Sequence, residues 1–275
     1  MRKLRTAVVQ LRSGIEPAAN RAAAMPLLRQ AASAGARLIA TPENTTRMDR
    51  NRERMFAAVG PEKGDPELLA WGRAAQELGV WLLMGSGPIA TGDGKVFNRS
   101  FFFDPDGRIV ARYDKINLFD VTLGGTENYR ESDTVQGGGQ AVVVDGPMGA
   151  KLGLTICYDV RFAPLYASLG RAGAEIIAVP AAFTVPTGQA HWEILLRARA
   201  IETGSFVIAP AQGGHHEDGR DTWGHSMIID PWGKVLAQLE DDEPGFIVAD
   251  LNLDEVAAAR AKIPAWQGGR EFKTP

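Results

Sequence analysis

The sequence predicts a layered α/β protein. Short apolar segments rich in valine and isoleucine alternate with segments of helical periodicity from one end of the 275-residue chain to the other. In addition, the pattern of residues 101–110 returns at residues 227–236, as an apolar strand, Asp-Pro-x-Gly and a second apolar strand. Asp, Pro and Gly suit the first, second and fourth positions of a type I turn. Two similar hairpins far apart indicate two related halves, each with its own sheet.

The alternation resolves into individual strands and helices. The predicted strands are 4–11, 37–41, 80–86, 98–103, 109–113, 141–144, 151–156, 175–179, 206–209, 226–229, 235–238 and 246–251. The predicted helices are 17–34, 66–78, 164–171, 191–202 and 254–262. Asp65-Pro66 opens one of these helices and Gly79 closes it. No Gly/Ser linker divides the chain, so we expect one domain over residues 1–275.

The composition is that of a globular enzyme, with 45% apolar and 23% charged residues. The formal net charge of −3 gives no electrostatic reason to expect a nucleic-acid or acidic-membrane partner. No apolar segment is long enough for a membrane span or a signal-peptide core. One cysteine cannot form an internal disulfide, which fits a reducing compartment. We therefore expect a cytoplasmic protein.

Cys157 ends the predicted strand 151–156 and precedes the helix predicted at 164–171. A thiol at such a corner lies near a helix N-terminus, where N–H groups and the helix dipole favour a thiolate and can stabilise an oxyanion. The alternative is a lone cysteine that acts as a small core hydrophobe, which is the commoner fate of single cysteines. Position alone leaves both interpretations open.

A nucleophilic thiol needs a base. The chain has four histidines, none of which its spacing marks as that base, so a Cys–His pair stays open. A carboxylate can do the same work beside a cation. Glu43 follows the predicted strand 37–41, and Lys115 follows the first hairpin. Each alone would be read as a surface charge, but both lie beyond strand ends, as Cys157 does, where α/β sheets build their sites.

Three segments resemble the glutamate, lysine and cysteine motifs of the nitrilase superfamily of carbon-nitrogen hydrolases, in the same order: Thr41-Pro42-Glu43, residues 114–120 and residues 154–162. Residues 187–202 and 223–233 are similar to its Nit branch of amidases, which includes deaminated-glutathione amidase and omega-amidase. The resemblance spans nearly the whole chain. It implies a four-layer α-β-β-α sandwich that forms a homodimer or a higher homo-oligomer.

The resemblance also implies a catalytic triad of Glu43, Lys115 and Cys157, with Glu131 as a second glutamate that orients the lysine or the substrate. The expected reaction is hydrolysis of a small, carboxylate-bearing amide through a cysteine thioester, with release of ammonia or an amine. Lys115 and the backbone N–H of Tyr158 would stabilise the oxyanion. No metal or organic cofactor is needed, because the thiol and the charged groups supply every step.

Arg161, His191 and Trp192 are the candidate substrate contacts beside Tyr158. The segment 215–217 is closer to the deaminated-glutathione amidase type than to omega-amidase. Two departures from the branch leave specificity open. Gln189 stands where proline is usual, and the residues after Glu43 lack the usual apolar or small residue followed by an aromatic one.

Other activities are considered as alternatives. An omega-amidase acting on keto-acid monoamides, a carbamoylase and a true nitrilase use the same motifs. A catalytically silent binding scaffold is an alternative from another class, but a scaffold has no chemical need for Glu43, Lys115, Cys157 and Glu131.

Three further segments have simpler interpretations. His215-His216-Glu217-Asp218 lacks the helical spacing of zinc hydrolases and is expected to be a solvated or substrate-facing loop. Residues 85–90 imitate a dinucleotide fingerprint, but the sequence after Pro88 does not open a helix. The mixed-charge run 47–54 is most simply a solvated face, or, as a second interpretation, a source of arginine for an anionic substrate.

Overall fold

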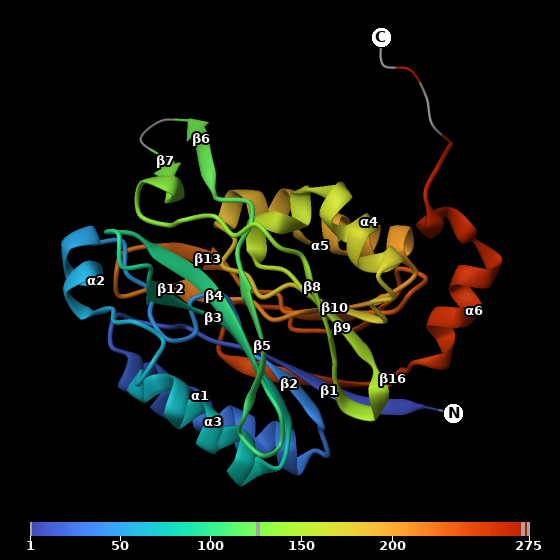
Figure 1. The fold of residues 1–275 in the computed structure, drawn as a ribbon, viewed down its shortest axis with the longest axis horizontal. Helices are drawn as coiled ribbons and strands as arrows, with labels where there is room; N and C mark the ends of the chain where they lie inside the picture. Colours follow the sequence, from blue (N-terminus) through green and yellow to red (C-terminus); the bar gives the residue numbers. More distant parts are fainter. Residues whose placement is uncertain (1, 125–126, 271–272, 274–275) are drawn as a thin grey trace.

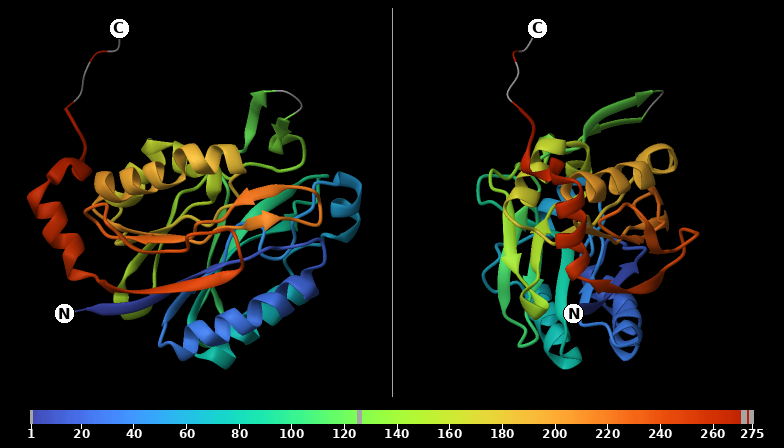
Figure 2. Two further views of the ribbon diagram at one scale, coloured as in Figure 1. Left: turned by 180° about the vertical axis from the view of Figure 1, so that it is seen from behind. Right: turned by 90° about the vertical axis from the view of Figure 1, so that its right-hand side faces the viewer.

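Two six-stranded sheets stack face to face, and helices cover the outer face of each sheet (Figure 1, Figure 2). The computed structural model describes residues 2–124, 127–270 and 273. The predicted four-layer α-β-β-α sandwich is confirmed. No helix among these residues is long and apolar enough to cross a membrane.

The first sheet has the strand order β16-β1-β2-β3-β4-β5. Its strands are β1 (Lys3–Gln10), β2 (Leu38–Ala40), β3 (Trp81–Ala90), β4 (Val96–Phe103), β5 (Ile109–Asp114) and β16 (Gly245–Asn252). Its three central strands are parallel, and the strands outside them pair antiparallel. Helices α1 (Pro17–Ser33) and α3 (Pro66–Leu78) cover its outer face (Figure 1).

The second sheet repeats this pattern in the order β15-β14-β11-β10-β9-β8. Its strands are β8 (Val142–Asp145), β9 (Lys151–Leu154), β10 (Ile176–Ala178), β11 (Phe206–Ala209), β14 (Met227–Ile229) and β15 (Val235–Gln238). The three central strands are again parallel, and the two Asp-Pro-x-Gly hairpins, β4-β5 and β14-β15, occupy equivalent edges. The prediction of two related halves is confirmed. Helices α4 (Ala163–Arg171) and α5 (Val185–Thr203) cover this sheet.

The shorter elements depart most from the prediction. Helix α6 (Asp254–Lys262) has its predicted bounds, but α5 begins at Val185, six residues early, because Pro186 fits a first helical turn. The sequence did not predict α2, the hairpins β6-β7 and β12-β13, or the 3-10 helices, since none of them has a long apolar period. Their bounds are α2 Arg52–Ala58, β6 Asp120–Gly124, β7 Glu127–Arg130, β12 Gly213–His215, β13 Asp221–Trp223, η1 Glu131–Asp133, η2 Pro147–Gly149, η3 Cys157–Arg161 and η4 Pro264–Gln267.

Two apolar layers hold the sandwich together. One lies between the sheets and continues under α4 and α5, and it includes Val8, Leu83, Leu154 and Leu196. The other packs Trp71 and its neighbours on α1 and α3 against the first sheet. Burying both faces of each sheet contributes about 25 cal/mol for each Å² of apolar surface removed from water. Strand ends anchored in these layers are rigid supports for side chains just beyond them.

Gly85 explains part of the segment that resembled a dinucleotide fingerprint. It lies within β3, so the segment opens no helix, as expected. A methyl group at position 85 would lie 2.0 Å from the carbonyl oxygen of Thr41 and 2.2 Å from that of Pro42. Glycine is needed here because the chain leading to Glu43 passes directly over the strand.

We predict that Gly85→Ala lowers the free energy of unfolding by about 1–3 kcal/mol, because the added carbon displaces backbone rather than a flexible side chain. Urea denaturation measures this loss. Gly60→Ala is the matched control, since an added carbon there meets nothing within 4 Å. Equal stability of the two variants would contradict the close approach of the Glu43 segment.

Candidate active site

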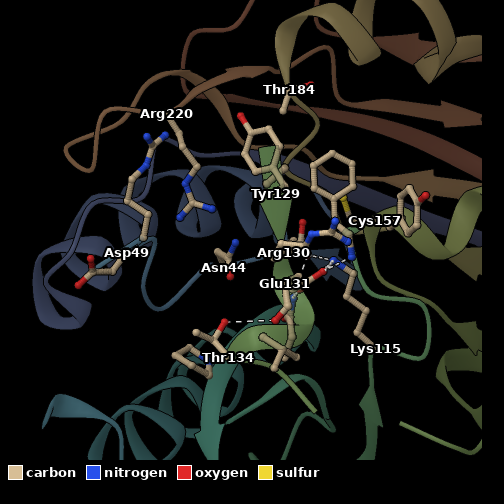
Figure 3. Close-up of a pocket in the computed structure, with 18 of the residues that line it drawn as sticks. Asn44, Asp49, Lys115, Tyr129, Arg130, Glu131, Thr134, Cys157, Thr184 and Arg220 are labelled. Atoms are coloured by element: carbon tan, nitrogen blue, oxygen red, sulfur yellow. Dashed lines mark hydrogen bonds and ion pairs between the residues drawn. The ribbon is translucent and has the colours of Figure 1, made fainter. Parts of the chain in front are cut away.

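A pocket of about 590 Å³ opens where the two sheets present the carboxyl ends of β2, β5 and β9 (Figure 3). Glu43, Lys115, Glu131 and Cys157 all line it. These side chains come from segments separated by tens of residues, and the folded chain brings them together. The sequence argument that strand ends would converge on one site therefore agrees with the geometry.

Glu43 directly follows β2 and is held from both halves of the molecule. The amide nitrogen of Asn44 donates to the Ser86 hydroxyl at 2.9 Å, and the Gln212 side chain donates to the Glu43 carbonyl at 2.9 Å. Asn44 has a φ of 57°, which asparagine tolerates better than most residues. The Glu43 side chain is 4% exposed, so its carboxylate is aimed inward from a fixed backbone.

Lys115 is a buried ammonium with a complete set of acceptors. Its Nζ donates to Glu43 Oε1 at 2.8 Å and to Glu131 Oε1 and Oε2 at 3.1 and 2.9 Å. Its side chain is 2% exposed. Three donors face three carboxylate oxygens, which offsets the cost of removing the charge from water. Glu131 is itself fixed by the Phe119 amide, which donates to Oε2 at 2.6 Å.

Asn98 is a site residue that the sequence reasoning missed. Its side-chain amide donates to Glu43 Oε1 at 2.9 Å and to Glu131 Oε1 at 3.3 Å, and its backbone carbonyl accepts from the Lys115 amide at 3.0 Å. It thus bridges both carboxylates around the lysine. The available signal was a polar residue within a strand whose other residues are mostly apolar, a position where a polar group needs a specific partner.

Cys157 is the first residue of η3, the 3-10 turn between β9 and α4. Its φ is 49°, a conformation that residues with a Cβ rarely adopt and that marks strained functional corners. Its amide donates to the Pro180 carbonyl at 2.9 Å. The next amide, that of Tyr158, lies in the first turn of the 3-10 helix, where N–H groups have no partner within the helix.

Burial and neighbouring charges shift the pKa values of Cys157, Glu43 and Lys115. Burial and the negative charge of Glu43 raise the pKa of the Cys157 thiol well above its usual value, and Lys115 offsets them only in part. Burial alone would raise the pKa of Glu43, but Lys115 and hydrogen bonds from Cys157 and Asn98 hold it below its ordinary value. Burial also opposes the charge of Lys115, yet the two carboxylates raise its pKa well above the usual value. These shifts favour a protonated thiol beside the ion pair of Glu43 and Lys115, which agrees with the expectation that Cys157 needs a base.

Two of the four expected substrate contacts line the pocket, and two do not. Tyr158 and Arg161 line the pocket, and the Arg161 guanidinium lies over the rings of Tyr158 and Phe183 at 5.7 and 5.3 Å. His191 and Trp192 are not among the lining residues, which corrects the sequence expectation. Trp192 is buried in the core against Phe183, and its indole N–H donates to the His225 carbonyl at 2.9 Å. His191 is exposed and contacts Arg161 at 3.3 Å.

The interpretation of residues 47–54 as a solvated face was wrong in part. Arg47 and Asp49 are buried, and the Asp49 carboxylate receives two hydrogen bonds of 2.7 Å from Arg54. Three arginines of this run line the pocket, together with three from later segments: Arg47, Arg50, Arg52, Arg130, Arg161 and Arg220. Figure 3 shows Arg220 across the cavity from Lys115. The second interpretation, arginine beside the site, fits this placement.

The two histidines of the segment 215–218 lie in different environments. His216 is buried, not solvated, and its ring nitrogens contact the Ser13 carbonyl at 2.8 Å and the Thr222 hydroxyl at 2.6 Å. His215 is exposed and pairs with Asp221. Within residues 2–124, 127–270 and 273, no group of three His, Cys, Asp or Glu side chains is placed to hold a metal ion.

Comparison with known proteins shows which family the chain belongs to. A deaminated glutathione amidase of Synechocystis is 39% identical over 270 residues, which are 97% of this chain and 98% of that protein. The crystal structure of C. elegans NitFhit superposes with a TM-score of 0.88 at 33% identity, covering 98% of this chain but only 65% of that longer chain.

Two further structures are similar along their whole length. Saccharomyces cerevisiae Nit3, of branch 10 of the nitrilase superfamily, has a TM-score of 0.84 at 26% identity, with 95% of this chain and 94% of that chain covered. An amidase from Nesterenkonia, in a mutant form with acrylamide added to its active-site cysteine, has a TM-score of 0.77 at 27% identity, with 95% and 98% covered. The carbon-nitrogen hydrolase family matches residues 5–261. The chain therefore belongs to the carbon-nitrogen hydrolases of the nitrilase superfamily and is a hydrolase of carbon–nitrogen bonds other than peptide bonds.

Proposed function

We propose that this protein hydrolyses a small amide with Cys157 as nucleophile, Glu43 as base and Lys115 as electrostatic partner. One observation carries the proposal: a buried free thiol lines the same pocket as a carboxylate that accepts a 2.8 Å hydrogen bond from a buried ammonium. This arrangement supplies a proton acceptor at the thiol and a positive charge near the carbon that it attacks. The two Nit-type relatives and the amidase with its modified active-site cysteine support it.

The first half of the reaction forms the thioester. Glu43 takes the thiol proton as the sulfur bonds to the amide carbon, and the carbonyl oxygen becomes an oxyanion. Lys115 and the Tyr158 backbone N–H stabilise this oxyanion. All three Lys115 donors are engaged at rest, so one bond must be released. Glu131 accepts with two oxygens and can give up one contact while it keeps the other.

The second half regenerates the enzyme. The carbon–nitrogen bond breaks as Glu43 returns its proton to the departing nitrogen, which leaves as ammonia or an amine. Glu43 then takes a proton from water, whose oxygen attacks the thioester carbon. When the carbon–sulfur bond breaks, the same proton returns to Cys157 and the carboxylic acid product leaves. Because one carboxylate serves both halves, an ionised Glu43 and a neutral thiol form a complete resting state.

The arginines support a substrate that carries a carboxylate away from the reacting amide. Arg161 is the last residue of η3, the turn that begins at Cys157, and further guanidinium groups line the same pocket. A guanidinium binds a carboxylate with paired hydrogen bonds. We propose deaminated glutathione, or an amide of that type, as the substrate, in line with the names of the relatives. A keto-acid monoamide is the second candidate.

We further propose that residues 1–275 act as one domain in a cytoplasmic homodimer or higher oligomer. The family match covers residues 5–261, and the buried free thiol suits a reducing compartment. On α5, Ile194 and Ile201 lie two turns apart on one face and are 70% and 52% exposed. Exposed apolar side chains in such a row are typical of a surface that another subunit covers. Sedimentation velocity measures the resulting mass.

The first test concerns the nucleophile. Cys157→Ser is expected to fold normally and to lose turnover of an amide panel by about four to six orders of magnitude, because a hydroxyl is a far weaker nucleophile beside the same base. Mass spectrometry of the wild type with a slow amide should locate an acyl group on the Cys157 peptide, and Cys157→Ala should show none. Undiminished turnover by the serine variant would end the thioester mechanism.

The second test concerns the charge of Glu43. Because that charge raises the pKa of Cys157 while Lys115 lowers it, Glu43→Gln should lower the pKa of the thiol. Alkylation of Cys157 at neutral pH should then speed up, roughly tenfold for each unit that the pKa falls, although turnover is lost. The alkylation rate is measured against pH. Glu193→Gln, which changes an exposed glutamate, is the control. Identical profiles in Glu43→Gln and wild type would remove Glu43 from the thiol's environment.

The third test concerns the carboxylate. Wild type should prefer a carboxylate-bearing amide over its neutral isostere, and Arg161→Ala should lose about 1.5–3 kcal/mol of that preference, or one to two orders of magnitude in kcat/KM. Arg108→Ala removes an exposed arginine that does not line the pocket and should change nothing. If the wild type treats both amides alike, the anionic substrate is wrong. If Arg161→Ala keeps the preference, another arginine is the anchor.

A further inference from the structure

Asp159 is a fully buried carboxylate two residues after Cys157, and it accepts four hydrogen bonds. Its Oδ2 accepts from the Tyr113 hydroxyl at 2.7 Å and from the Ile156 amide at 2.9 Å. Its Oδ1 accepts from the backbone and side-chain amides of Asn117 at 2.9 and 2.8 Å. Two carboxylate oxygens offer about four acceptor positions, so Asp159 has none left for a substrate.

The four donors come from the two segments that carry the reacting groups. Tyr113 and Asn117 lie two residues before and two residues after Lys115, and Ile156 directly precedes Cys157. The lysine segment leaves β5 in the first sheet, whereas the cysteine turn leaves β9 in the second. One carboxylate therefore joins the two sheets at the point where Lys115 and Cys157 approach each other.

The cysteine turn needs such support. Cys157 has a φ of 49°, which is unfavourable for a residue with a Cβ. The Ile156 amide that precedes it is bound by the Asp159 side chain, and the Asp159 amide donates to the Ile156 carbonyl at 3.1 Å. The same residue thus closes the strained turn from both directions. Any loosening there moves the sulfur relative to the lysine.

We propose that Asp159 is a positioning residue that fixes the Cys157 thiol relative to Lys115. It touches no reacting atom, and its effect passes through the Ile156 amide on one side and the Asn117 amide and Tyr113 hydroxyl on the other. The proposal rests on the proposed roles of Cys157 and Lys115. Displacements of about 1 Å at such a contact slow a reaction strongly, because the attack needs near-ideal geometry.

Asp159→Asn directly tests whether the hydrogen bonds of Asp159 join the lysine and cysteine segments. Each carboxylate oxygen accepts from one backbone N–H, that of Ile156 or that of Asn117, and neither can turn away. In either orientation of the new amide, one of them faces an NH₂ group. The variant therefore loses the hydrogen bond from the Asn117 amide, on the lysine segment, or the one from the Ile156 amide, on the cysteine segment. We expect kcat to fall on the order of a hundredfold, with KM changed less than about threefold.

Tyr113→Phe carries the test if Asp159→Asn does not fold. It removes one hydrogen bond to Asp159 and keeps the carboxylate, and kcat should fall roughly tenfold. Tyr166→Phe is the matched control, since Tyr166 is also fully buried and its hydroxyl bonds Thr155 at 2.8 Å rather than Asp159. The control should lose similar stability and keep the wild-type kcat. Combined with Asp159→Asn, Tyr113→Phe should cause little further loss, because both act on one contact.

A second readout needs no substrate. Lys115 lowers the pKa of the Cys157 thiol, so a looser lysine should move the pH profile of thiol alkylation to higher pH in Tyr113→Phe but not in Tyr166→Phe. If both tyrosine variants keep the wild-type kcat and alkylation profile, Asp159 serves stability alone and the proposal is wrong. Failure of the proposed function is a different result, namely full turnover by Cys157→Ser.

Discussion

The buried ammonium of Lys115 is the constraint on which the rest of the site depends. An unpaired charge at this depth would cost several kcal/mol, and the fold tolerates it only because Glu43 and Glu131 surround it with three oxygens. Asn98 bridges the two carboxylates. The same cluster shifts the pKa of the proposed nucleophile, because the negative charge of Glu43 raises the pKa of the Cys157 thiol and the positive charge of Lys115 lowers it. A permanently formed thiolate would be reactive toward any electrophile, whereas a neutral thiol beside its base limits reactivity to molecules that the pocket can hold.

The two-sheet architecture supplies the rigidity that this chemistry needs. Glu43, Lys115 and Glu131 belong to the first half of the chain and Cys157 to the second, and the interface between the sheets is a continuous apolar core. Around the site, polar contacts cross between the halves through Asp159, and through the side chain of residue 212, which holds the Glu43 carbonyl. Packing of the apolar core sets the distance between the two sheets. These hydrogen bonds set the positions of the site residues relative to one another.

The sequence by itself determined the fold class, the paired hairpins and most strand positions, because alternation of apolar residues and turn signals are local properties. It also identified Glu43, Lys115 and Cys157 as candidates, since their positions beyond predicted strand ends can be read from the sequence. Glu131 became a candidate only through the resemblance to the nitrilase superfamily. It missed α2 and the small hairpins, which have short polar sequences. It placed His191 and Trp192 at the pocket because helix position does not reveal which face is turned inward.

Only the tertiary structure decided which polar side chains around the site form hydrogen bonds with one another. Asn98 and Asp159 are ordinary polar residues in the sequence, and they matter because residues far along the chain converge on them. The charge state of Cys157 was also beyond the sequence. A position near a helix start favours a lower thiol pKa, whereas burial and the neighbouring Glu43 charge raise it. Burial and distance between charges are properties of the packed chain, and they outweigh the local dipole that the sequence reveals.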